Sequence, residues 1–169
     1  MATFTGGCLC GDLRFEASGR PYRVGLCHCL DCRKRHGALF HASAVFPADA
    51  VTITGEGRDY RSRYFCPRCG APVFDRSGDE VLVYLGSLDA PNQLAPTYEL
   101  WNVRREAWLP PFPVARRYEY DRDSTDATKS DGVAAGSRSF VVTHAPAPRP
   151  AGTALRRITI HLDVTAAGQ

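Results

Sequence analysis

Apolar and polar residues alternate over many short segments of the chain, and glycine, proline or aspartate separates these segments. A period of two residues is typical of a strand that buries one face. The segment at 80–86 (EVLVYLG) has the strongest strand character, because it is rich in β-branched and aromatic residues. The other predicted strands lie at 13–16, 40–46, 51–54, 62–65, 71–75 and 97–103.

The last of these predicted strands contains two aromatic residues that could line a pocket. Tyr98 and Leu100 are predicted to face one side of it, and Glu99, Trp101 and Val103 the other. For Tyr98 and Trp101 a place in the core is the stronger expectation, and the wall of a pocket is the alternative.

Helical periodicity is scarce, and a single helical turn is predicted near 29–35. Many short strands with few helices indicate an all-β fold of antiparallel sheets. Prolines near residue 110 prevent regular pairing, so the domain is predicted to span 1–122. The remaining residues, 123–169, have the composition of a linker and tail. The alternating residues at 158–163 leave an added strand as the alternative to disorder.

The composition excludes some classes of function. The 169 residues carry a formal net charge of +3, which is small for a protein that neutralises phosphates, so no nucleic-acid partner is expected. No apolar run approaches the ~18 residues that a membrane span needs, and the amino terminus does not resemble a secretion signal. We therefore expect a cytoplasmic protein without a membrane partner.

The seven cysteines fall into three close groups. We call four of them the outer cysteines and three the central cysteines. The outer cysteines are Cys8, Cys10, Cys66 and Cys69, and the central cysteines are Cys27, Cys29 and Cys32. An odd number of closely spaced thiols in a reducing compartment favours metal binding over disulfides.

Zinc fits these groups because it takes four ligands in a tetrahedron and accepts thiolates readily. A tight turn presents two sulfurs from one loop, and Gly70, directly after Cys69, is expected to supply a positive φ. Gly7 and Gly11 are expected to give the first loop the same freedom.

Seven thiols divide naturally into four and three, which predicts two zinc ions per chain. The outer cysteines would form a closed structural site, and the central cysteines would chelate a second ion by themselves. The fourth position of that second site is either open or filled by His36. His28 is less suited, because it lies between two ligands and is expected to point away.

At these residues the chain resembles the family of glutathione-dependent formaldehyde-activating enzymes, also called the centromere protein V family. The matching segments are GGCLCGDLRFEA, CHCLDCRKRHGALF, RYFCPRCGAPVF and the region that ends in WNVRREAWLPPFP, in this order over about residues 4–115. The resemblance implies a zinc-stabilised β-tent fold, with structural zinc on the outer cysteines and catalytic zinc on the central cysteines. His36 stands where the family has a small polar residue.

The resemblance also implies a carbon–sulfur lyase that joins glutathione to formaldehyde. A thiol bound to zinc loses its proton, which suits such chemistry, and His28 or His36 would protonate the alkoxide. Arg33, Lys34 and Arg35 would attract an anionic thiol or simply form a solvated turn. The alternative functions are a non-catalytic zinc-stabilised module that binds a protein and, less favoured, a zinc-ribbon nucleic-acid binder.

Overall fold

The structure is a computed structural model, and it describes residues 1–122. The predicted linker and tail at 123–169, together with the added strand predicted at 158–163, lie outside the described residues. No helix among residues 1–122 is long and apolar enough to span a bilayer.

A small antiparallel sheet contains the first turn that carries cysteines. Its strand order is β1-β2-β5, and the turn between β1 and β2 holds Cys8 and Cys10. Phe15 and Ala17 of β2 point inward and are buried, whereas Glu16 between them is exposed. The three strands are β1 (Thr3–Gly7), β2 (Arg14–Ser18) and β5 (Val51–Thr54).

A larger sheet carries the remaining cysteines. Its strand order is β11-β10-β3-β4-β9-β8-β7-β6. The pairs of β10 with β3 and with β11 are parallel, and the other pairs are antiparallel. The eight strands are β3 (Arg23–Cys27), β4 (His41–Pro47), β6 (Arg58–Tyr60), β7 (Arg63–Phe65), β8 (Pro72–Ser77), β9 (Glu80–Tyr84), β10 (Tyr98–Leu100) and β11 (Arg116–Arg117).

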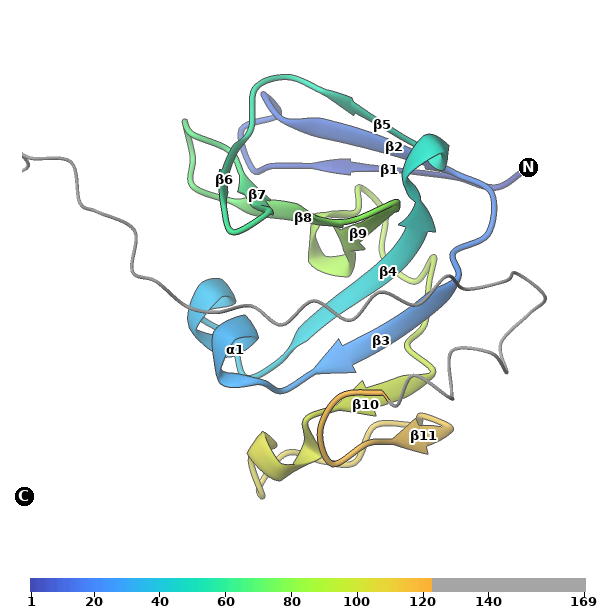
Figure 1. The fold of residues 1–169 in the computed structure, drawn as a ribbon, viewed down its shortest axis with the longest axis vertical. Helices are drawn as coiled ribbons and strands as arrows, with labels where there is room; N and C mark the ends of the chain where they lie inside the picture. Colours follow the sequence, from blue (N-terminus) through green and yellow to red (C-terminus); the bar gives the residue numbers. More distant parts are fainter. Residues whose placement is uncertain (123–169) are drawn as a thin grey trace, which may run out of the picture. The chain divides into compact units, whose positions relative to one another are not determined.

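The one α-helix of the described chain follows β3 directly (Figure 1). It is α1 (Leu30–His36), which confirms the helical turn predicted near 29–35. Three short 3-10 turns complete the regular structure: η1 (Ala48–Ala50), η2 (Leu85–Ser87) and η3 (Asn102–Arg104). The predicted all-β fold of antiparallel sheets is therefore confirmed, with two parallel pairings added at the β11 edge of the large sheet.

One apolar core connects the two sheets. Phe4 and Phe15 from the small sheet belong to the same buried cluster as Phe46, Phe74 and Val83 from the large sheet. The rings of Phe4 and Phe46 pack with centroids 5.7 Å apart. This core holds the two turns that carry the outer cysteines against each other.

Several strand predictions were wrong in detail. Strands β1, β3, β6 and β11 were not predicted, and the segment at 85–86 belongs to a 3-10 turn. The strand predicted at 97–103 is only β10, because Trp101 adopts a left-handed backbone (φ 59°) and ends it. Tyr98 and Leu100 do lie opposite Glu99, but the fully buried residue is Glu99.

Candidate metal centres

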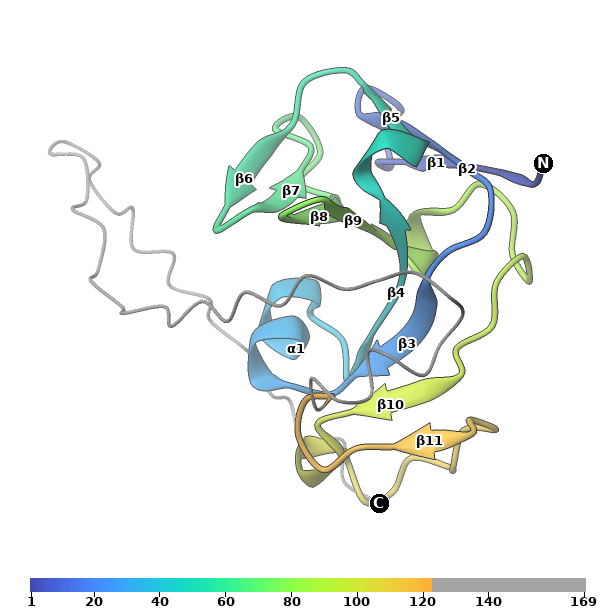
Figure 2. The same cartoon turned by 45° about the vertical axis from the view of Figure 1, so that its right-hand side comes forward.

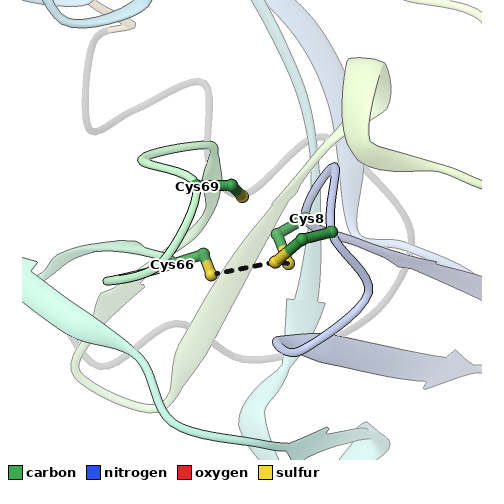
Figure 3. Close-up of side chains that lie close together, drawn as sticks. Cys8, Cys66 and Cys69 are labelled. Atoms are coloured by element: carbon green, nitrogen blue, oxygen red, sulfur yellow. Dashed lines mark hydrogen bonds between the residues drawn. The ribbon is translucent and has the colours of Figure 1, made fainter.

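The outer cysteines come together from two turns that belong to different sheets. Cys8 and Cys10 lie in the turn between β1 and β2, and Cys66 and Cys69 lie in the turn between β7 and β8. Their sulfur atoms all lie within 4.8 Å of one another. Figure 3 shows the thiols of Cys66 and Cys69 on one loop, across from Cys8 on the other.

Backbone hydrogen bonds shape both turns. The N–H of Cys8 donates to the carbonyl of Leu13 (2.9 Å), and the N–H of Leu13 donates to Cys8 Sγ (3.2 Å). In the other turn, the N–H of Cys66 donates to the carbonyl of Ala71 (3.0 Å), and the N–H of Gly70 donates to the carbonyl of Cys66 (2.9 Å). Both turns are therefore closed around their sulfurs before any metal is considered.

The glycines of these turns have different roles. Gly70 and Gly11 have positive φ values of 74° and 84°, as predicted. The prediction for Gly7 was wrong, because Gly7 belongs to β1 and is not among the glycines with positive φ. It is needed for space: a Cβ there would lie 2.4 Å from the carbonyl oxygen of Leu13.

The spacing of the outer cysteines fits a zinc ion. The sulfurs of Cys8 and Cys10 are 3.5 Å apart, and those of Cys10 and Cys66 are 3.6 Å apart. Four thiolates in a tetrahedron at ~2.3 Å from zinc would be ~3.8 Å apart. The donor set therefore matches a closed structural site in both chemistry and size.

The pKa values of these thiols favour a shared negative charge. The N–H groups of Ala71 and Cys10 lower the pKa of Cys69 to about 6. Burial raises the pKa of Cys8, but hydrogen bonds with the N–H of Leu13 and with the thiols of Cys10 and Cys66 outweigh it and lower this pKa below its usual range. The N–H of Asp12 lowers the pKa of Cys10, yet burial and the other thiols raise it to about 12. A cluster that already holds negative charge attracts a cation.

The central cysteines lie where β3 meets α1. Cys27 is the last residue of β3, Cys29 is the N-cap of α1, and Cys32 lies in the first turn of this helix. Their sulfurs lie within 4.8 Å of one another. The backbone N–H of Cys32 donates to Cys29 Sγ (3.4 Å), as a capping side chain requires.

Hydrogen bonds among the central cysteines favour a negative charge on one of them. Hydrogen bonds from the thiols of Cys27 and Cys32 lower the pKa of Cys29 to about 2. The Cys29 thiolate in turn raises the pKa of Cys27 to about 11, and the pKa of Cys32 is raised because its thiol hydrogen-bonds both neighbours. The hydrogen bonds among the central cysteines therefore favour negative charge on Cys29, and a group that favours such a charge attracts a cation.

Within residues 1–122, neither His28 nor His36 has a ring nitrogen close enough to the sulfurs of the central cysteines to belong to this group. His28 is fully buried and its Nε2 lies 3.3 Å from Glu99 Oε1, as expected for a side chain that points away from its neighbours. His36 stacks on His41, with ring centroids 4.3 Å apart. The described residues thus bring three candidate ligands together in this group.

His36 and His41 form a pair of uncharged rings near the central cysteines. Cys27 is the register partner of His41, and Cys29 lies close enough to influence the pKa of His41. Burial lowers the pKa of His36 to about 4 and that of His41 to about 3. Both rings meet the edge of Tyr84, whose hydroxyl donates to Asp75. His41, Tyr84 and Asp75 were not singled out from the sequence.

The basic residues after Cys32 are partly committed within the protein. Arg33 pairs with Glu106 and donates to the carbonyl of Arg104 (2.8 Å), and Arg35 donates to the carbonyl of Tyr64 (3.2 Å). Lys34 is exposed. For Arg33 the structural interpretation is therefore favoured over the attraction of an anionic thiol.

Tyr98 and Trp101 are both half-buried. Tyr98 lines a pocket of about 380 Å³ that also contains Arg23 and Tyr118, and none of the cysteines lines it. Trp101 packs against Tyr120, with ring centroids 5.4 Å apart. Of the two residues, Tyr98 thus follows the pocket alternative, in a pocket that none of the cysteines lines.

The chain is similar to one solved structure and matches one family of known proteins. A protein of Rhodobacter sphaeroides with a solved structure is 20% identical, with a TM-score of 0.42, over 53% of this chain and 91% of that one. Residues 3–104 match the family described as glutathione-dependent formaldehyde-activating enzyme. This match covers more than half of the chain and includes all seven cysteines. The chain therefore belongs to the glutathione-dependent formaldehyde-activating enzyme family.

Proposed function

We propose that the protein is a zinc-dependent carbon–sulfur lyase that makes or breaks the adduct of a small thiol, such as glutathione, with a small aldehyde, such as formaldehyde. The observation that carries the proposal is the division of seven thiols into one group of four and one group of three. Membership of the glutathione-dependent formaldehyde-activating enzyme family supports glutathione and formaldehyde as the proposed substrates.

The outer cysteines would hold a structural zinc ion. Four thiolates fill a tetrahedral shell and leave no position for a substrate. Because two ligands come from each sheet, this ion would fasten the β1–β2 turn to the β7–β8 turn. Its role is to maintain the fold and not to take part in the reaction.

The central cysteines would hold a second zinc ion with one open position. Bound there, the ion would supply a site at which an added thiol loses its proton. The N-cap position of Cys29 and the register of Cys27 with His41 fix two of the three sulfurs on regular elements. This preorganisation is what a site with exchangeable ligands requires.

The reaction needs a proton as well as a nucleophile. When a thiolate sulfur attacks an aldehyde carbon, a carbon–sulfur bond forms and the carbonyl oxygen becomes an alkoxide that must be protonated. His28 is less suited to give this proton, because its Nε2 is directed to Glu99. The proton comes from the attacking thiol, and we assign its transfer to the His36–His41 pair: an uncharged ring would accept the proton that the thiol loses and pass it to the alkoxide. His41 Nε2 is buried and has no hydrogen-bond partner in residues 1–122.

The experiment that tests the function measures chemical exchange between free glutathione and its formaldehyde adduct by ¹³C NMR. Metal-loaded wild type should accelerate the exchange above its spontaneous rate, and Cys29→Ser should not, although it remains folded. Metal analysis of reduced protein should find two zinc ions in the wild type and one in Cys27→Ser. Two ions without acceleration would favour the non-catalytic, partner-binding alternative, and one ion in the wild type would rule out the second site.

A further inference from the structure

A carboxyl group lies fully buried next to the loop of the central cysteines. Glu99 is 0% exposed, although it belongs to a short strand near the β11 edge of the large sheet. A buried carboxylate is costly unless it has charged or hydrogen-bonding partners. The alternation of side chains along β10 therefore does not by itself explain why a carboxyl group is buried at residue 99.

Glu99 has three polar partners, which come from three different segments. Arg117 Nε in β11 lies 2.9 Å from Glu99 Oε2, and Arg105 Nε lies 3.5 Å from Oε1. The third partner is His28, whose Nε2 lies 3.3 Å from Oε1. The carboxyl group thus connects the residues after β10 with the loop between β3 and α1.

Parallel pairing with β3 brings β10 to this loop. Leu100 is the register partner of Cys27, and the N–H of His28 donates to the carbonyl of Leu100 (3.0 Å). Figure 2 shows β10 alongside β3, close to the start of α1. Adjacent residues of β10, Glu99 and Leu100, therefore hold the side chain and the backbone of His28.

His28 is anchored at only one ring atom. Its Nδ1 is buried and has no hydrogen-bond partner within residues 1–122, so Nε2 to Glu99 is the polar contact that orients the ring. The ring also packs against Phe40, with centroids 5.8 Å apart. Because His28 stands between Cys27 and Cys29, contacts that hold its ring and its backbone also restrict the backbone from which both flanking thiols project.

We infer that Glu99 and His28 are positioning residues that hold Cys27 and Cys29 in the geometry of a metal site. The inference rests on the proposed function, since it assumes that the central cysteines bind a metal ion. Groups that orient metal ligands typically affect metal affinity by about 10- to 100-fold. Glu99 and His28 would act on the central cysteines alone, because the outer cysteines lie on other turns.

The test measures the dissociation constants of both metal ions by competition with a chelator, in full-length reduced protein. His28→Leu removes the contact with Glu99 and should weaken the central ion about 10- to 100-fold, with the outer ion unchanged. His28→Gln retains an amide N–H for Glu99 and should recover most of this loss. Substitution by cobalt(II) adds a spectroscopic readout, since its thiolate charge-transfer bands should change in His28→Leu and return in His28→Gln.

Arg117→Gln is the matched control. It removes an ion pair of Glu99 but leaves the contact with His28, so it should lower the melting temperature without weakening the central ion. Equal affinities for the central ion in His28→Leu, His28→Gln and wild type would overturn the inference while leaving the proposed function intact. A wild type that binds one ion in total would instead overturn the proposed function. A loss of the central ion in Arg117→Gln as large as in His28→Leu would reduce Glu99 to a general stabilising role.

Discussion

The sulfur atoms of Cys10 and Cys66 lie 3.6 Å apart, although the two residues are 56 positions apart in the chain. One belongs to the turn of the small sheet and the other to a turn of the large sheet. A metal ion bound to both residues would close a long loop. Such a crosslink restricts the unfolded chain and so stabilises the folded state, and the effect grows with the length of the loop. The central cysteines, by contrast, lie within six consecutive residues and close no such loop.

This difference predicts unequal effects of two serine substitutions. Cys66→Ser breaks the site that joins the sheets, and Cys66 is also fully buried, so the domain is expected to unfold. Cys29→Ser is expected to leave a folded protein with one zinc ion. Circular dichroism and metal analysis would measure both results. Equal loss of folding in the two variants would contradict the division of roles.

Removal of metal should proceed in two stages. A chelator added to reduced, zinc-loaded protein should first take the ion from the central cysteines, because three protein ligands bind less firmly than four. The secondary structure should persist during this stage and should be lost only when the second equivalent leaves. A colorimetric zinc indicator combined with circular dichroism would follow both events. A single stage, in which unfolding accompanies the first equivalent, would be the contrary result.

Two glycines with positive φ provide a matched pair for the outer site. Gly70 has a φ of 74°, and a Cβ there would meet nothing within 4 Å, so Gly70→Ala should cost only about 1 kcal/mol for its backbone conformation. Gly55 has a φ of 89°, and a Cβ there would lie 1.8 Å from the carbonyl oxygen of Asp12. Gly55→Ala should therefore cost more than about 3 kcal/mol. Denaturant unfolding of the zinc-loaded proteins would compare them, and equal losses would show that the turn relaxes freely.

The stability of the protein should fall as the pH is lowered through the titration range of His41. Burial and the neighbouring His36, together with the charges of Arg35 and Arg63, lower the pKa of His41 to about 3, although Cys29 opposes this shift. In the unfolded chain this pKa returns to about 6.5. Below pH 6.5 the unfolded state therefore binds a proton that the folded state does not, and unfolding becomes easier.

The expected slope is about 1.4 kcal/mol per pH unit for each such proton. Between pH 6 and pH 4, the free energy of unfolding should fall less steeply in His41→Phe than in the wild type, and the two slopes should differ by this amount. The reason is that phenylalanine keeps the ring contacts and cannot bind a proton. Because acid also releases metal from thiolates, the comparison is made in the Cys29→Ser background as well. If the free energy of unfolding falls in parallel with pH for the two proteins in that background, protonation of His41 does not contribute to the loss of stability.

Part of the fold was accessible from local pattern. β9 was predicted because alternating β-branched residues extend along it. Strand β3 was missed because Val24, Gly25 and Leu26 are all buried, so the strand shows no alternation. Strand β1 was missed because its paired glycines resemble a turn. The structure shows why Gly6 is there: a Cβ would lie 2.3 Å from the carbonyl oxygen of Ser87.

The grouping of the cysteines was predicted because chelation by short turns depends on spacing that the sequence displays. Glu99 was missed as a feature of the site for the opposite reason. A glutamate in a short alternating strand is expected to face solvent, and only its tertiary partners, His28 and the two arginines, account for its burial. Such partners are distant in sequence, so no local signal could have indicated them.

The wide separation of the outer cysteines also fixes the order in which ligand sets become complete during translation. All three central cysteines are synthesised before Cys66. A growing chain thus contains a complete set of metal donors while the set that fastens its sheets is still half complete. The ion that would support catalysis can be captured early, and the ion that would secure the fold has to wait for residue 69.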